Sequence, residues 1–130
     1  MKLEHTGITV SDPYAFADWY CQHLGFRVAR QHPTSPFTTF LADPSGSVLI
    51  EVYRHPQITL FDYASLDPLL LHFAFEVGDE PIQVVAERLM AAGATMQKEL
   101  TVIATGDQLI MLRDPWGLAL QLVHREPRLI

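Results

Sequence analysis

The sequence predicts an α+β domain built from two tandem βαβββ units, and two observations carry this prediction. The first is an internal repeat, because motifs near the start of the chain recur in the same order near its middle, at a nearly constant offset. The second is periodicity: each half begins with a strand-like alternation, continues with apolar residues at helical spacing and ends in three strand-like runs.

The repeat has two landmarks in each half. A histidine near the start is followed at the same spacing by a valine and an aspartate, once from His5 and once from His72. Near the end, an Asp-Pro-x-Gly turn precedes an apolar run that one polar residue interrupts, Glu51 in the first half and Gln121 in the second. Such a turn is common by itself. Its recurrence in the same order with the histidine indicates a duplication.

The first unit is predicted to span residues 1–55. LEHTGITV alternates and is rich in β-branched residues, which favours a strand. Asp12 is a suitable helix N-cap with Pro13 at the first helical position, and Gly25 is placed to end that helix. Three strands are then expected, approximately at Arg27–His32, Phe37–Ala42 and Val48–Tyr53.

The second unit is predicted to span residues 69–130, after a connection at 56–68. It repeats the scheme with a strand at Leu70–Val77 and a helix at Pro81–Ala92, which Gly93 ends. Three strands are then expected at Thr95–Thr101, Gln108–Arg113 and Ala119–His124.

Composition excludes several classes of function. The 130 residues carry a formal charge of -6, and an acidic protein without a basic stripe is suited neither to nucleic acid nor to an anionic membrane surface. No stretch approaches the roughly 20 apolar residues of a membrane span. The single cysteine, Cys21, cannot form an internal disulfide. We therefore expect a soluble cytoplasmic protein, and the low charged fraction of 18% points to surface buried in an oligomer.

Strand alternation places four polar side chains where they can line a cavity. His5 shares its strand face with Gly7, and His72 shares its face with Ala74, so small neighbours leave a hollow beside both imidazoles. A carboxylate within VLIEVY and a carboxamide within LALQLV are costly to bury without partners.

A lone histidine or glutamate on a strand is more often solvent-facing, or satisfied by local hydrogen bonds, than a ligand. Here all four polar residues occupy repeat-equivalent positions at the two ends of each unit. Two imidazoles, one carboxylate and one amide oxygen suit a divalent transition metal. The sequence therefore predicts a metal site formed by His5, Glu51, His72 and Gln121.

With these residues, the chain resembles the vicinal oxygen chelate superfamily from Leu3 to about His124. That superfamily includes glyoxalase I, fosfomycin-resistance proteins, extradiol dioxygenases, methylmalonyl-CoA epimerase and bleomycin-resistance proteins. The resemblance implies an eight-stranded cupped mixed sheet with the helices outside, and one divalent ion (nickel, zinc, manganese, cobalt or iron) on the four residues. It further implies a small-molecule substrate chelated through neighbouring oxygens, and a homodimer whose site lies within one chain or is shared by two.

Position 121 departs from glyoxalase I, which supplies a glutamate there as ligand and base. Gln121 can offer a neutral oxygen but cannot take a proton, so Glu51 becomes the candidate catalytic base. A metal-dependent lyase, isomerase or transferase is the first hypothesis. The alternatives are a metal-free binding or sequestering protein of the bleomycin-resistance type and an iron-dependent extradiol-type dioxygenase.

Other residues are weaker candidates. Glu76 is expected on the cavity face beyond Ala74, either as a substrate contact or as a solvated rim residue. Phe40, Tyr53 and Met111 are candidate wall residues that also suit a plain apolar core.

Overall fold

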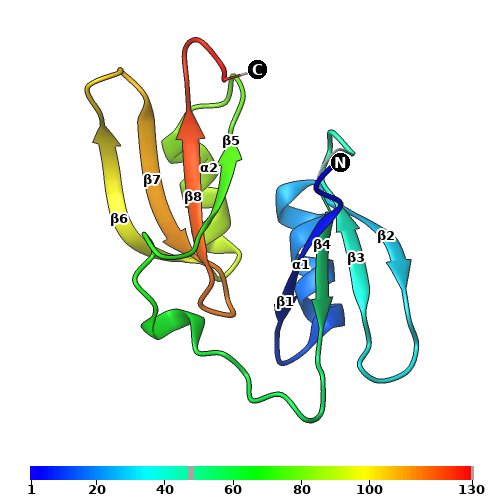
Figure 1. Cartoon of the computed structure of the whole chain (residues 1–130). Coiled ribbons are helices and arrows are strands. Elements are labelled where there is room, and N and C mark those ends of the chain that lie inside the picture. The colour runs from blue at the N-terminus through cyan, green and yellow to red at the C-terminus, as the bar shows by residue number, and fades with distance from the viewer. Residues whose placement is uncertain (47–48, 130) are drawn as a thin grey trace. The chain divides into compact units, whose positions relative to one another are not determined.

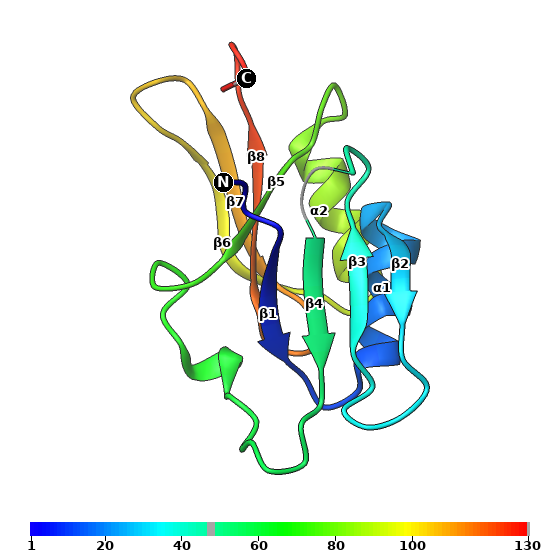
Figure 2. The same cartoon turned by 45° about the vertical axis from the view of Figure 1, so that its right-hand side comes forward.

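The computed structural model describes residues 1–46 and 49–129. The chain divides into two compact units, residues 1–61 and 62–130, each of which is described by itself. In both units a four-stranded mixed sheet carries one helix on one face, as Figure 1 and Figure 2 show. The predicted α+β class with two βαβββ units is thus confirmed, and the eight strands are hydrogen-bonded as two sheets of four.

The first unit places its first and last strands side by side. Its sheet has the order β1-β4-β3-β2, with β1 parallel to β4 and the other pairs antiparallel. In the β1–β4 register Gly7 lies opposite Glu51. The elements are β1 His5–Thr9, α1 Pro13–Leu24, β2 Arg27–Gln31, β3 Thr39–Ala42 and β4 Leu49–Tyr53.

The second unit repeats this topology with the order β5-β8-β7-β6. Here β5 is parallel to β8, and Ala74 lies opposite Gln121, as Gly7 lies opposite Glu51 in the first unit. A short 3-10 turn, η1, precedes the sheet. The elements are η1 Tyr63–Ser65, β5 Phe73–Glu76, α2 Ile82–Ala91, β6 Thr95–Val102, β7 Gln108–Arg113 and β8 Ala119–His124.

Local sequence explains where α1 begins and ends. The Asp12 carboxylate accepts hydrogen bonds from the backbone N–H groups of Tyr14 and Ala15 at 3.0 and 3.1 Å, which satisfies donors that the helix leaves unpaired. Pro13 is the first helical residue, and Gly25 ends the helix at a φ of 71°. The predicted caps of this helix are confirmed.

The core of each unit lies between its helix and one face of its sheet. Because side chains alternate along a strand, burying one face against the helix leaves the other face uncovered by it. In the first unit Phe16 and Tyr20 of α1 are fully buried together with Leu41 and Val52 of the sheet. In the second unit the corresponding buried side chains are Ile82, Leu89, Leu112, Leu120 and Leu122.

Arg113 forms hydrogen bonds with the segment around η1, which precedes β5. Its guanidinium donates to the carbonyl oxygens of Tyr63, Leu66 and Gly117 at 2.7–2.9 Å. Gly117 has a φ of 86°, and a Cβ built there would lie 2.8 Å from the backbone nitrogen of Ala64. Glycine at this position therefore allows the η1 turn to approach the turn before β8.

Two strand predictions were wrong at their starts. The strand expected from Phe37 begins at Thr39, because Phe37 has a φ of 59° and its N–H bonds the Thr34 carbonyl in a turn. The strand expected from Leu70 begins at Phe73, because the Leu70 N–H bonds the Asp67 carbonyl in another turn. His72 consequently lies just before β5, and the predicted strand start at 48 falls outside the described residues.

The edge strands β2 and β6 are more exposed than the other strands of their sheets. Every residue of β2 is exposed, as is every residue of β6 except Thr101. Both strands have irregular registers against their neighbours, between Val28 and Arg30 in β2 and on both sides of Lys98 in β6. In the described part of the chain no helix has the length and apolar character to cross a membrane.

Candidate metal centre

The first unit brings His5 and Glu51 together. They project from adjacent parallel strands, and the alternation that pairs Gly7 with Glu51 places His5, two residues earlier, on the same face. His5 Nε2 lies 3.4 Å from Glu51 Oε2, and both side chains are partly exposed. The structure therefore places these two candidate ligands on one face of the sheet, close to each other.

Gly7 leaves the space that the Glu51 carboxylate occupies. A Cβ built on Gly7 would lie 3.2 Å from Glu51 Oε2 and 3.6 Å from Tyr53 Cε1. The first contact is tighter than an ordinary carbon–oxygen approach, so any other residue would press on the carboxylate. The hollow expected beside His5 is therefore real, and the Glu51 carboxylate lies in it.

Aromatic side chains border this hollow. The Phe40 ring meets the His5 imidazole edge-on with ring centroids 5.6 Å apart, and Phe40 lies opposite Glu51 in the β3–β4 register. Tyr53 follows Glu51 on the same strand face and is half-buried, like Phe40. Both were candidate wall residues, and the structure places both beside His5 and Glu51.

Both predicted histidine ligands have their Nδ1 atom engaged. His72 Nδ1 lies 2.8 Å from the Pro68 carbonyl oxygen, which can only accept, so Nδ1 carries the hydrogen. His5 Nδ1 contacts the carboxylate of Glu4, which also accepts. In a neutral imidazole this tautomer leaves Nε2 with its lone pair exposed, and that is the form in which histidine binds metals.

The second unit contains the other two candidate metal ligands, His72 and Gln121. Ala74 lies opposite Gln121, and alternation along β8 assigns Gln121 to the face away from α2, whereas His72 precedes β5 and strand alternation does not assign it to a face. Met111, the third candidate wall residue, lies opposite Gln121 on β7 and is buried. No hydrogen bond joins His72 to Gln121, both of which belong to the described residues.

The donor set of the first unit fits a divalent ion. Two atoms that each bind one metal at about 2.1 Å lie about 3.4 Å apart in a tetrahedral site and about 3.0 Å apart in an octahedral one. The His5 Nε2–Glu51 Oε2 distance of 3.4 Å matches the tetrahedral value. Each unit supplies two of the four predicted ligands, and no group of three or more His, Cys, Asp or Glu in the described ranges is arranged to hold a metal.

The single cysteine, Cys21, is not one of the candidate metal ligands. Burial, and then the negative charge of Asp18, raise the pKa of the Cys21 thiol above its ordinary value. The thiol therefore stays protonated at neutral pH, a form that neither attacks electrophiles nor binds metals well.

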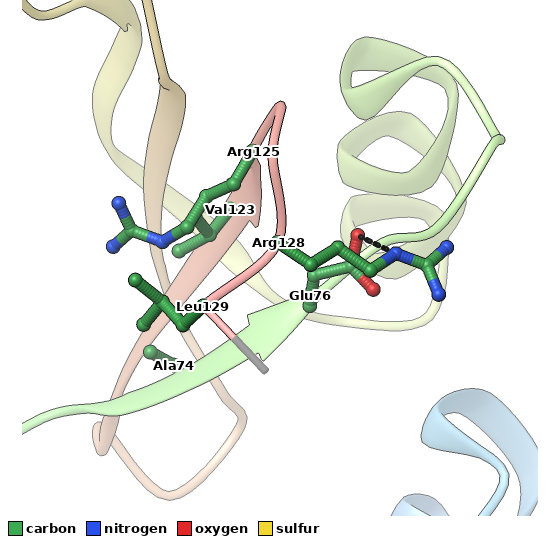
Figure 3. A pocket seen from close by; sticks show the side chains of 6 residues that line it. All are labelled: Ala74, Glu76, Val123, Arg125, Arg128 and Leu129. Atoms are coloured by element: carbon green, nitrogen blue, oxygen red, sulfur yellow. Dashed lines mark ion pairs between the residues drawn. The ribbon is translucent and has the colours of Figure 1, made fainter. Parts of the chain in front are cut away.

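Sequence reasoning missed a pocket in the second unit. It has a volume of about 390 Å³, and Figure 3 shows the six side chains that line it. Glu76 was singled out in advance, whereas the arginines after β8 were not, because they have no repeat-related pattern and reach the pocket only through the bend that follows the strand. The lining residues are Ala74, Glu76, Val123, Arg125, Arg128 and Leu129.

Comparison with known proteins identifies the family. The sequence profile of the Glyoxalase/Bleomycin resistance protein/Dioxygenase superfamily matches residues 2–122. The chain belongs to this superfamily. Members of this superfamily, also called vicinal oxygen chelate proteins, commonly use a divalent metal, often bind small molecules and often form dimers.

Solved structures of the glyoxalase family share the fold. A glyoxalase family protein from Bacillus cereus aligns with a TM-score of 0.80 at 17% identity, covering 95% of this chain and 93% of the other. A glyoxalase/bleomycin resistance protein/dioxygenase family enzyme from Burkholderia phytofirmans aligns with a TM-score of 0.74 at 20% identity, covering 95% and 98%. No curated protein matches the sequence. At these identities the likeness is one of fold.

Proposed function

We propose that the chain is a divalent-metal-dependent glyoxalase-like enzyme of the lyase, isomerase or transferase type, acting on a small substrate with neighbouring oxygen atoms. The metal ligands would be His5, Glu51, His72 and Gln121. The observation that carries the proposal is the approach of His5 Nε2 to Glu51 Oε2 at 3.4 Å, with Nδ1 of His5 held by Glu4. The equivalent Nδ1 contact of His72 supports it.

Each ligand has a distinct task in this proposal. A bound divalent ion would supply Lewis acidity, drawing electron density from the substrate oxygens. Glu51 is the catalytic base, because its carboxylate lies in the Gly7 hollow and takes up a proton from the carbon next to those oxygens. Gln121 would offer the metal a neutral oxygen, and its amide cannot take up a proton. Phe40 and Tyr53 limit the access of water to the base.

The complete site requires one first unit and one second unit, because each contributes two ligands. We propose a cytoplasmic homodimer, in which the two units come from one chain or from two. The charged fraction of 18% supports the dimer, since a buried interface core is depleted in charge.

A second candidate is a metal-free small-molecule binding protein of the bleomycin-resistance type. The pocket of about 390 Å³ in the second unit favours it, because that volume suits a small ligand and its lining includes Ala74, Val123 and Leu129. The two candidates differ in whether His5 and His72 are needed for a ligand to bind.

Metal analysis of the purified chain tests the proposal. We expect close to one divalent ion per complete site after chelation and reloading with nickel, zinc, manganese, cobalt or iron, and no loading of H5A or H72A. H32A is the matched control, because His32 is exposed and its side chain makes no hydrogen bond or ion pair among the described residues. A folded wild-type protein that takes up no metal under any loading would overturn the enzyme proposal and leave the binding protein.

A further inference from the structure

The Tyr53 ring leans toward the candidate ligands of the first unit. Tyr53 follows Glu51 by two residues on β4, so both side chains project from the same face of the sheet. A Cβ built on Gly7 would lie 3.6 Å from Tyr53 Cε1, 4.0 Å from the Tyr53 hydroxyl oxygen and 3.2 Å from Glu51 Oε2. Tyr53 itself lies opposite Thr9, so its ring reaches Gly7 only by leaning back along the strand toward Glu51. The phenol and the carboxylate therefore border the same hollow over Gly7.

The Tyr53 hydroxyl has no hydrogen-bond partner among the described residues, and neither Glu51 nor His5 accepts its proton. In the described part of the chain every buried side-chain nitrogen and oxygen has a partner, so the Tyr53 oxygen is exposed to solvent. Tyr14 provides a contrast, because its hydroxyl donates to the His32 carbonyl oxygen at 2.6 Å. Tyr53 therefore keeps its one O–H donor for a molecule that enters the hollow.

Three other groups that border this hollow are acceptors or apolar. The Glu51 carboxylate only accepts hydrogen bonds, and His5 presents the lone pair of Nε2 in the tautomer set by its Nδ1 contact. Phe40 contributes a ring edge without a polar atom. A negatively charged oxygen beside Glu51 is repelled by the carboxylate. The Tyr53 O–H supplies the hydrogen-bond donor that these three groups lack.

The spacing of the phenol and the carboxylate suits one small molecule between them. Glu51 Oε2 and the Tyr53 hydroxyl oxygen make no hydrogen bond to each other, yet both lie within 4.0 Å of one point over Gly7. A carbon atom and the oxygen on its neighbouring carbon can therefore be placed between the two side chains. The carbon then faces the carboxylate, and the oxygen faces the phenol.

We propose that Tyr53 is a substrate-binding residue whose hydroxyl donates a hydrogen bond to the substrate oxygen that becomes negatively charged. The inference rests on the proposed function, in which Glu51 takes a proton from the carbon next to the substrate oxygens. As that C–H bond breaks, its electron pair delocalises onto the adjacent oxygen, and the Tyr53 O–H stabilises the charge there. The charge disappears when a proton returns to carbon, and Tyr53 keeps its own proton throughout.

Acetohydroxamate tests this role, because it is a small anion that chelates metals through two neighbouring oxygens. The full chain is loaded with the ion that metal analysis shows it to take up. Calorimetry then measures the Kd of the metal and the Kd of acetohydroxamate for the wild type and for Y53F, which keeps the ring and removes the hydroxyl. We expect Y53F to bind the metal as the wild type does, and to bind acetohydroxamate about tenfold more weakly, because a hydrogen bond to a charged oxygen is lost.

Y14F is the matched control, since it removes the same group from a tyrosine of α1 whose hydroxyl donates to the His32 carbonyl. It should leave both Kd values unchanged. Equal acetohydroxamate affinity in Y53F and the wild type, including no binding by either, would overturn the role of Tyr53. Loss of metal binding in Y53F would also overturn it, because the residue would then belong to the metal site itself. A wild-type chain that takes up no metal overturns the proposed function and this inference together, so the two failures are distinguishable.

Discussion

Replacing Gly7 by alanine should separate metal binding from stability. The new Cβ would lie 3.2 Å from Glu51 Oε2, and an ordinary contact requires a few tenths of an ångström more. Metal–ligand distances tolerate only about 0.2 Å, so the displaced carboxylate can no longer meet an ion at its best distance. We expect metal affinity to fall about tenfold, which corresponds to about 1.4 kcal/mol.

The same substitution should leave the fold intact or slightly more stable. Gly7 lies within β1, and its backbone is outside the left-handed region, so alanine fits there. Alanine also lowers the conformational entropy of the unfolded chain, which raises the free energy of unfolding by about 0.5–1 kcal/mol. Calorimetric metal titration and urea denaturation of the metal-free protein measure the two effects. Unchanged metal affinity in a folded G7A variant would refute the reasoning that Glu51 is a ligand held by the Gly7 hollow.

Three further predictions concern packing, orientation and reactivity. Gly117→Ala should lower the free energy of unfolding by about 1–3 kcal/mol more than Gly106→Ala, because both glycines have φ near 90° but only a Cβ at 117 meets a backbone nitrogen of η1. Urea denaturation followed by circular dichroism compares the two, and equal losses would contradict the packing argument. Glu4→Gln should weaken metal binding about tenfold in a calorimetric titration, because the neutral amide makes the His5 imidazole a weaker ligand. Alkylation of Cys21 by iodoacetamide at neutral pH should be slower than that of glutathione and should speed up in urea, because its raised pKa reduces the reactive thiolate in the folded state.

The repeat allowed most of the fold to be predicted, since each half confirmed the interpretation of the other. Strands β7 and β8 have the predicted bounds, Gln108–Arg113 and Ala119–His124, because apolar residues fill them and turn residues flank them. The starts of β3 and β5 were wrong. Apolar residues at 37 and at 70–71 are typical of strands, but turns closed by local hydrogen bonds place them outside the sheet.

The candidate site was likewise predicted only in part. Strand alternation and the repeat together predicted that His5 and Glu51 line one cavity, and the parallel β1–β4 register of the structure places both on one face. The Nδ1 partners were beyond prediction, since the Pro68 carbonyl reaches His72 only through the turn before β5. The Arg128 pocket was equally hidden, because it depends on the direction of the chain after β8, for which the sequence carries no periodic signal.

The irregular outer strands have a consequence for self-association. An exposed sheet edge is a template on which another chain can add a strand, as in fibril growth. In β2 the register breaks beside Arg30, and in β6 it breaks on both sides of Lys98, so each edge is locally bent where it also carries a positive charge. Two copies that approach edge to edge would meet misaligned hydrogen-bonding groups and like charges. These two edges therefore resist the growth of a continuous intermolecular sheet, whereas the opposite edge strands, β1 and β5, pair with their neighbours in a regular register.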